Sequence, residues 1–295
     1  MLTIENVIES ADLFKANIVK YTFLKDGPEN KTYKVECGDK TYCVRITQSK
    51  QRLYFGLEAK KEAQACQQAS AFSIAPTVHS TDHNAEYLIT DFFHGRCLTD
   101  EDARNSEIMK KYIEAIKLIH NNVKVDRFFS IYDRFYKYIE TAKSFERKLP
   151  DWLNKVMEQV ESIKEMRNDS KIINNVFCHN DIWHGNILYD GNAICIIDWE
   201  FCGYGDGFFD LAHISRGDMT FEEEKFMLKI YFGHFEMEMW EMLQQMKYIS
   251  RVYDALWYAF HSCMADDIDQ KNLFMEAATK QREAASQFLN RKPHG

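Results

Sequence analysis

Five consecutive segments between residues 176 and 200 constrain the fold of this chain more than any other feature. An apolar run is followed by a polar loop, a second apolar run, a turn of sequence Asp-Gly-Asn and a third apolar run. Short apolar runs separated by Gly, Asn and Asp predict β-strands joined by a loop and a hairpin. Polar side chains fall at the strand ends: His179, Asp181 and Asn186 lie in the loop, and Asp198 follows the third run.

An aspartate, an asparagine five residues later and a second aspartate beyond a hairpin suit phosphoryl transfer, which depends on placement and charge neutralisation. Asp181 can accept the proton of an attacking hydroxyl, whereas Asn186 and Asp198 offer the oxygen ligands that Mg²⁺ prefers. The alternative is an Asx-rich turn with Asp198 as a helix cap, since Asp and Asn favour turns. Residue types, spacing and hairpin agree, which favours phosphoryl transfer.

The order H-N-D, N and D-W-E in this segment resembles the kinase pattern H-R-D-x-x-x-x-N followed by D-F-G. From Cys178 to Ala212 the chain reads C-H-N-D-I-W-H-G-N-I-L and then I-D-W-E-F-C-G-Y-G-D-G-F-F-D-L-A. This stretch resembles the choline kinase and aminoglycoside phosphotransferase family, and its bacterial-type choline kinases in particular. The resemblance implies a protein-kinase-like α+β fold of two lobes: a small antiparallel-sheet N-lobe over residues 1–91 and a mostly helical C-lobe over residues 92–295.

Composition excludes several classes of protein. A chain of 295 residues that is 45% hydrophobic can bury a sizeable core. A net charge of −8 argues against a nucleic-acid surface and is compatible with a small cationic partner. The eight cysteines form no C-x-x-C pair, which favours reduced thiols over structural zinc. No apolar run has membrane-spanning length, so we expect a cytoplasmic protein without a membrane partner.

Strand-forming runs dominate the first ninety residues. They cover residues 18–24, 32–37, 41–46, 75–79 and 86–90, and an Ala- and Glu-rich segment over 56–72 predicts a helix among them. The turn after the first run resembles the family's G-G-x-T-N-x-x-Y loop, with Gly27, Asn30 and Tyr33 in place. The resemblance implies that Asn30 lies at the nucleotide phosphates, and a plain surface hairpin is the alternative.

The resemblance also assigns nucleotide contacts to the third strand and to the crossing between the lobes. Arg45 matches the position of a phosphate-pairing Lys in kinases, and an Arg can bind two phosphate oxygens at once. An acid of the following helix is expected to pair with it: Glu62 by family spacing, with Glu58 as the alternative. The crossing at Asp91, Phe92 and Phe93 matches the hinge whose backbone meets adenine.

The chain beyond residue 100 has helical periodicity. Helices are expected over 108–119, 128–160 with a break at Leu149-Pro150, 221–235, 237–265 and 273–289. The glycine-rich run 203–207 lacks the spacing of a dinucleotide-binding motif, and its glycines are predicted to let the backbone turn sharply.

Five residues of the C-terminal half are implied as contacts of the second substrate. Asp206 and Asp210 match family acids, although Asp210 can instead cap a helix, and Glu200 follows the metal-binding aspartate. Tyr253 and Trp257 share a helix face within a segment that resembles the aromatic wall of choline kinases. Core packing explains such an aromatic stripe equally well.

Together these features predict an enzyme that uses ATP and Mg²⁺ to phosphorylate a small cationic alcohol, most favourably choline. Aminoglycoside, ethanolamine and thiamine kinases of the same fold are the alternatives within the class. A pseudokinase-like module that binds nucleotide without turnover is the alternative from another class, and the presence of Asp181, Asn186 and Asp198 argues against it. The sequence leaves the oligomeric state open.

Overall fold

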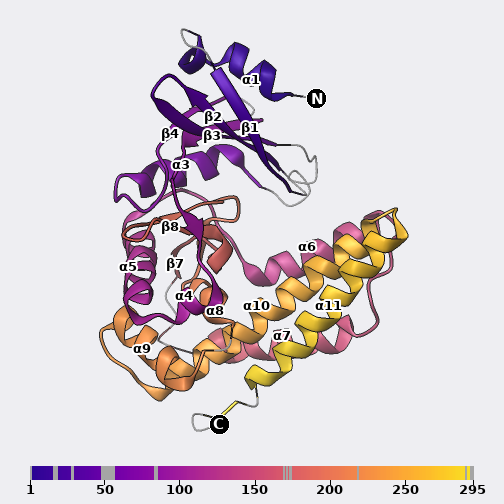
Figure 1. The fold of residues 1–295 in the computed structure, drawn as a ribbon. Helices are drawn as coiled ribbons and strands as arrows, with labels where there is room; N and C mark the ends of the chain where they lie inside the picture. Colours follow the sequence, from indigo (N-terminus) through magenta and orange to yellow (C-terminus); the bar gives the residue numbers. More distant parts are fainter. Residues whose placement is uncertain are drawn as a thin grey trace.

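The structure is a computed structural model that describes residues 2–15, 19–27, 30–47, 57–82, 86–168, 170, 172, 175–217, 219–289 and 291–292. An N-terminal lobe built around an antiparallel sheet is followed by a larger lobe that is mostly helical (Figure 1). The predicted α+β architecture of two lobes is therefore confirmed. Of the positions used in the predictions, Ile18, Gly56 and residues 28–29 and 83–85 lie outside the described residues.

Five antiparallel strands form the sheet of the first lobe, in the order β1-β2-β3-β5-β4. They are β1 (Val19–Asp26), β2 (Asn30–Cys37), β3 (Lys40–Thr47), β4 (Val78–Thr81) and β5 (Tyr87–Asp91). One face packs against α1 (Ile4–Ser10) and buries Val35, Val44, Ile46 and Ile89. Because side chains alternate along a strand, Arg45 between Val44 and Ile46 points to the other face.

The predicted strand over 75–79 begins later than expected, at Val78. Its first residue, Ala75, and the preceding Ile74 pack in the core of the second lobe instead. The carbonyl of Ile74 accepts a hydrogen bond from the amide of Ile196 at 2.8 Å. Helix α3 (Ala59–Ser70) likewise buries Ala65, Cys66 and Ala69 in that core. Residues on both sides of position 91 thus pack in one core. The boundary between the lobes at residue 91 stays a prediction.

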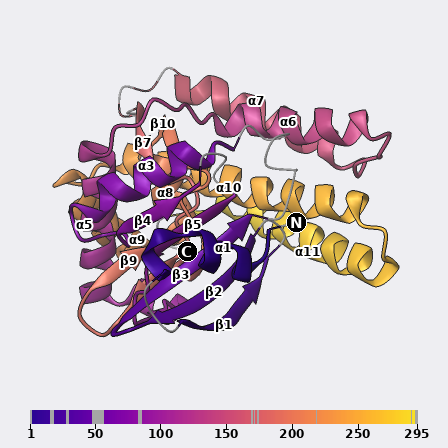
Figure 2. The same ribbon diagram turned by 90° about the horizontal axis from the view of Figure 1, so that it is seen from above.

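Most of the second lobe is helical. Its helices are α4 (Asp100–Arg104), α5 (Ser106–Asn122), α6 (Ile131–Ser144), α7 (Leu153–Asn168), α8 (Phe208–Ser215), α9 (Phe221–Phe232), α10 (Met237–Met264) and α11 (Ile268–Leu289), with a short 3₁₀ helix over His184–Asn186. A second short 3₁₀ helix, Asp12–Phe14, belongs to the first lobe. The long helices α10 and α11 pack along each other, and α6 and α7 contact α10 (Figures 1 and 2). The predicted break near Pro150 separates α6 from α7. Among the helices of the described residues, each is too short or too polar to cross a bilayer.

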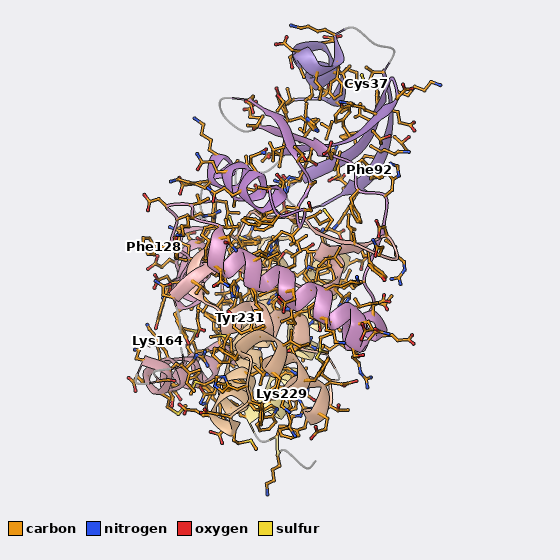
Figure 3. All side chains as sticks on the ribbon, turned by 90° about the vertical axis from the view of Figure 1, so that its left-hand side faces the viewer. Cys37, Phe92, Phe128, Lys164, Lys229 and Tyr231 are labelled. Carbon is orange, nitrogen blue, oxygen red and sulfur yellow. The ribbon has the colours of Figure 1, made fainter. Side chains whose placement is uncertain are left out.

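Short strands position the loops between the lobes. They are β6 (Arg96–Cys97), β7 (Asn175–Cys178), β8 (Ile187–Tyr189), β9 (Ile194–Ile196) and β10 (Gly203–Asp206), paired as β6-β8-β9 and β7-β10. The glycine-rich run forms β10 rather than the sharp turn that we predicted. A Cβ on Gly205 would lie 2.8 Å from the carbonyl oxygen of Phe129, so glycine allows β10 to approach that backbone closely. Figure 3 shows Phe92 where the chain leaves the strands of the first lobe.

Candidate active site

The loop between β7 and β8 carries Asp181 at the floor of the interlobe cleft. Its preceding residue, Asn180, has a φ of 64°, a left-handed conformation that Asn tolerates better than most residues. The Asn180 side chain supports this turn, because Nδ2 donates to the carbonyls of Phe201 at 3.1 Å and Gly203 at 3.2 Å. The backbone just before Asp181 is therefore fixed by the segment that follows Asp198.

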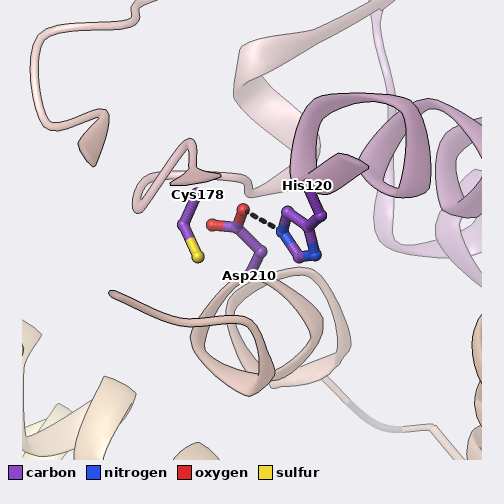
Figure 4. A group of neighbouring side chains, drawn as sticks. All are labelled: His120, Cys178 and Asp210. Atoms are coloured by element: carbon purple, nitrogen blue, oxygen red, sulfur yellow. Dashed lines mark hydrogen bonds and ion pairs between the residues drawn. The ribbon is translucent and has the colours of Figure 1, made fainter. Parts of the chain in front are cut away.

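Asp210 anchors the same loop from below. Its carboxylate accepts hydrogen bonds from the backbone amides of His179 at 2.9 Å and Asn180 at 2.7 Å, and from His120 Nε2 at 2.9 Å (Figure 4). Burial would raise the pKa of Asp210, but the hydrogen bond and charge of His120 lower it below its ordinary value. Since Asp210 is 0% exposed, the prediction that it contacts substrate is corrected: it positions the loop.

His120, Cys178 and Asp210 also lie close enough to resemble a metal site (Figure 4). The chemistry of the donors does not fit one. Burial raises the pKa of Cys178 well above its ordinary value, and its Sγ donates to the carbonyl of Val176 at 3.4 Å. His120 Nδ1 lies 2.5 Å from the hydroxyl of Tyr231, and both oxygens of Asp210 already accept hydrogen bonds. The group supports the loop.

Asp181 has the environment of a general base. Its Oδ2 accepts a hydrogen bond from Asn186 Nδ2 at 2.7 Å, which fixes the direction of the carboxylate. Burial, together with the negative charge of Asp198, raises the pKa of Asp181 to about 7. A carboxylate with a pKa near neutrality can take up a proton more readily than an ordinary aspartate. The arrangement fits the predicted role.

His213 is a neighbour of Asp181 that the sequence reasoning missed. It is buried on α8, with Nε2 3.3 Å from Asp181 Oδ1 and Nδ1 2.9 Å from the hydroxyl of Ser250. Burial, with the nearby cation of Arg216, lowers the pKa of His213 to about 3, so its ring is neutral. When Ser250 donates to Nδ1, the ring hydrogen lies on Nε2 and faces Asp181. The one sequence feature that could have indicated a role for His213 is its position three residues after Asp210, which places both on the same face of a helix.

A backbone hydrogen bond joins the segments that carry the two predicted metal ligands, Asn186 and Asp198. Asn186 is buried, and its carbonyl oxygen accepts a hydrogen bond from the amide of Ile197 at 3.0 Å, next to Asp198 in sequence. Asp198 has a φ of 67°. Because Asn186 Nδ2 is directed at Asp181, its Oδ1 remains for a cation. One amide oxygen and one carboxylate are hard ligands of the kind that Mg²⁺ requires, so the residues fit the ion.

Arg45 connects the sheet of the first lobe to this group. Its guanidinium contacts Glu62, and its Nη1 lies 2.9 Å from Asp198 Oδ1. Burial would lower the pKa of Arg45, but the charges of Glu62 and Asp198 raise it above its ordinary value. Glu58 precedes α3 and is exposed, which confirms Glu62 as the partner. The phosphate contact of Arg45 stays a prediction.

Removing the Arg45 charge is expected to raise the KM for ATP roughly ten- to hundredfold, the range of a charge-assisted hydrogen bond, and to lower kcat. Glu62→Gln should give a milder loss in the same direction, because the buried Glu62 holds the guanidinium in place. Steady-state kinetics of Arg45→Ala, Glu62→Gln and the matched control Glu58→Gln check this. Impairment of Glu58→Gln alone would contradict the assignment.

The cleft has a volume of about 1030 Å³ and runs from the β1–β2 turn past Asp181 to α10 and α11. Of the predicted site residues, it is lined by Asn30, Arg45, Asp181, Asp198, Glu200, Tyr253 and Trp257. The part beyond Asp181, lined by Arg134, Tyr138, Arg216, Tyr253, Asp254 and Trp257, is called the acceptor end below. Arg134 and Asp254 on α6 and α10, and Arg216 just after α8, were not predicted, since the sequence does not show which charged side chains face a cleft.

Tyr253 and Trp257 differ in burial. Tyr253 is 6% exposed, and its ring packs against Phe135, Tyr138 and Phe209. Trp257 is half-buried, with its ring centroid 4.1 Å from that of His261. Both rings therefore combine core packing with a face on the cleft.

Asp206 does not line this cleft. Arg167 Nη2 donates to its Oδ2 at 2.5 Å, and its Oδ1 accepts from the amide of Phe208 at 3.0 Å, at the start of α8. It borders a separate depression of about 420 Å³. The prediction that Asp206 contacts substrate is therefore corrected, because its carboxylate holds α7 and α8 together.

The predicted hinge begins where β5 ends. The amide of Asp91 donates to the carbonyl of Thr77 at 3.0 Å, and the amide of Phe92 donates to the carbonyl of Thr41 at 3.1 Å. These two amides are thus already hydrogen-bonded to the backbone on either side of the end of β5. Contact of Asp91, Phe92 or Phe93 with adenine stays a prediction.

Known proteins resemble this chain in sequence. It matches the phosphotransferase enzyme family over residues 20–246. It is 29% identical over 131 residues to probable choline kinase 3 of Arabidopsis thaliana. The aligned region covers 42% of this chain but only 37% of that protein. It is 28% identical over 206 residues to a LicA homologue of Metamycoplasma hominis, which covers 68% of this chain and 79% of the relative.

A solved structure gives the same indication for the fold. The choline/ethanolamine kinase family protein from Mesorhizobium loti matches with a TM-score of 0.78 at 18% identity, covering 98% of this chain and 97% of that chain. The family match extends from β1 into α10 and includes the loop of Asp181. This chain, with its protein-kinase-like fold, therefore belongs to the phosphotransferase enzyme family.

Proposed function

We propose that the chain transfers the γ-phosphoryl group of ATP to the hydroxyl of a small alcohol that carries a cationic ammonium group, with choline as the first compound to test. The observation that carries the proposal is that Asp181 and Asp198 line one cleft and that the buried Asn186 donates a hydrogen bond to Asp181 at 2.7 Å. Relatives named as choline kinases support an acceptor of this class. Aromatic rings at the acceptor end support it further, since a quaternary ammonium binds to aromatic faces.

In the proposed reaction, the acceptor oxygen bonds to the γ-phosphorus while the bond from that phosphorus to the bridging oxygen of ADP breaks. Asp181 takes the hydroxyl proton, and Asn186 keeps its carboxylate in position. Bound Mg²⁺, held by Asn186 and Asp198, would neutralise phosphate charge. Arg45 orients the phosphates from the sheet side.

A coupled assay of ADP release tests the function with choline, ethanolamine, thiamine and an aminoglycoside. We expect turnover of at least one small ammonium alcohol that depends on both ATP and Mg²⁺. Nucleotide binding without turnover of any acceptor would contradict the proposal. Preferred use of the aminoglycoside would move the substrate class to larger polycations.

Trp257 is expected to contribute to the binding of the ammonium group. A desolvated cation–π contact is worth about 2 kcal/mol, so Trp257→Ala should lower kcat/KM for choline roughly thirtyfold and leave ATP affinity nearly unchanged. Trp257→Phe keeps most of the volume and should lose less. Trp152→Phe, at a half-buried tryptophan outside the cleft, is the matched control. A lower melting temperature with unchanged substrate preference would assign Trp257 to the core.

A further inference from the structure

Each oxygen of the Asp181 carboxylate has a buried side chain as its neighbour. Asn186 Nδ2 donates to Oδ2 at 2.7 Å, and His213 Nε2 lies 3.3 Å from Oδ1. The side chain of His213 is 2% exposed, whereas that of Asp181 is 26% exposed and lines the cleft. The carboxylate can therefore be held at both oxygens while part of it stays open to a substrate.

One hydrogen-bonding arrangement fits the three residues Asp181, His213 and Ser250. An ionised carboxylate can only accept, so the hydrogen that meets Asp181 has to lie on Nε2 of the ring. Burial, with the nearby cation of Arg216, lowers the pKa of His213 to about 3, so the ring is neutral and Nδ1 carries no hydrogen. Nδ1 then accepts from the hydroxyl of Ser250 at 2.9 Å. Ser250, on α10, thus selects the tautomer of a histidine on α8.

Packing alone does not require this arrangement. Burying the polar atoms of an imidazole costs free energy, which an apolar side chain at position 213 would avoid. The fully buried Ser250 satisfies Nδ1 only. The other ring nitrogen, Nε2, lies against the side chain that acts as the base in the proposed reaction.

We propose that His213 is a positioning residue: with Ser250 fixing its tautomer, it donates from Nε2 to Asp181 Oδ1 and holds the carboxylate where it accepts the hydroxyl proton. This inference rests on the proposed phosphotransferase function and identifies a further residue on which its rate depends. His213 transfers no proton itself. The acceptor oxygen bonds to the γ-phosphorus, its proton passes to Asp181, and ADP leaves.

Two amide variants separate this role from packing. In His213→Gln the amide nitrogen can take the place of Nε2 and reach Asp181, whereas in His213→Asn the shorter amide takes the place of Nδ1 and meets only Ser250. In the ADP-release assay, kcat of His213→Asn is expected to fall roughly ten- to hundredfold, the range of a lost hydrogen bond to a charged group. His213→Gln should recover most of kcat, and the KM values for ATP and acceptor should change little in both variants. An equal or lower kcat in the Gln variant would overturn the inference.

Ser250→Ala tests the same contact without changing the imidazole. Its kcat should fall roughly three- to tenfold, the range of one neutral hydrogen bond, because the tautomer is no longer fixed. Ser262→Ala removes another buried hydroxyl of α10, outside the cleft, and should keep the natural kcat. In the background of Asp181→Asn, Ser250→Ala and His213→Asn should cause no further loss, since a residue that acts through the carboxylate has no effect once the carboxylate is removed. A further loss of full size would overturn the inference.

Failure of this inference and failure of the proposed function give different results. If the natural chain phosphorylates an acceptor and His213→Asn keeps its kcat, the inference is wrong and the proposed function stands. If the natural chain binds ATP but phosphorylates none of the four acceptors, both are wrong. If His213→Asn does not fold, the comparison of Ser250→Ala with Ser262→Ala decides the question, and equal kcat values for these two would overturn the inference.

Discussion

Asp181→Asn is expected to lower kcat by roughly a hundred- to ten-thousandfold, the usual contribution of a positioned general base. The amide has nearly the same shape as the carboxylate and can still contact Asn186, but it cannot accept the hydroxyl proton. Affinity for MgATP should stay close to that of the natural chain, because the proposed metal ligands remain. ADP release measures the first effect, and calorimetric titration with nucleotide measures the second.

The pH dependence of the natural enzyme should have the same origin. The pKa of Asp181 is raised to about 7, and only the ionised form can act as a base. Below about pH 7, kcat/KM should therefore fall tenfold for each unit of pH, whereas the residual activity of Asp181→Asn should lack this limb. Asp126→Asn, at an exposed position outside the cleft, is the control for the charge change. Activity in Asp181→Asn above about one tenth of the natural level would exclude the assigned role.

Features that depend on local sequence were predictable here. The hairpin between β8 and β9 follows from its turn residues, since the side chain of Asp190 accepts the amides of Asn192 at 2.8 Å and Ala193 at 2.7 Å. The pairing of Arg45 with Glu62 could be predicted only from the spacing seen in the family, because a strand residue and a helix residue come together only in the folded lobe. A periodic pattern indicates which face is buried but not what that face meets.

The misassigned acids illustrate that limit. Asp206 and Asp210 stand near the start of a helix in a segment rich in site residues, so the sequence could not distinguish cleft from interior. Their roles are set by partners far away in the chain, Arg167 on α7 and His120 on α5. His213 escaped notice for the same reason, since its contacts with Asp181 and Ser250 join three separate segments.

Asp198→Ala is expected to weaken nucleotide binding itself, in contrast to Asp181→Asn. Loss of residues that merely orient metal ligands typically costs ten- to a hundredfold in metal affinity, so loss of a direct ligand should lower MgATP affinity by about a hundredfold or more. The natural chain and the variant would be titrated with ATP in excess Mg²⁺ and again in a chelator. The loss should appear only with Mg²⁺.

The titration in chelator is informative because Asp198 has a second contact. Its carboxylate pairs with Arg45 at 2.9 Å and adds negative charge beside the proposed phosphate site. Removing that charge leaves Arg45 with Glu62 alone and reduces repulsion of metal-free ATP, which should therefore bind the variant as well as or better than the natural chain. An equal loss of affinity with and without Mg²⁺ would mean that Asp198 acts by holding Arg45. The second metal ligand beside Asn186 would then have to be a residue other than Asp198.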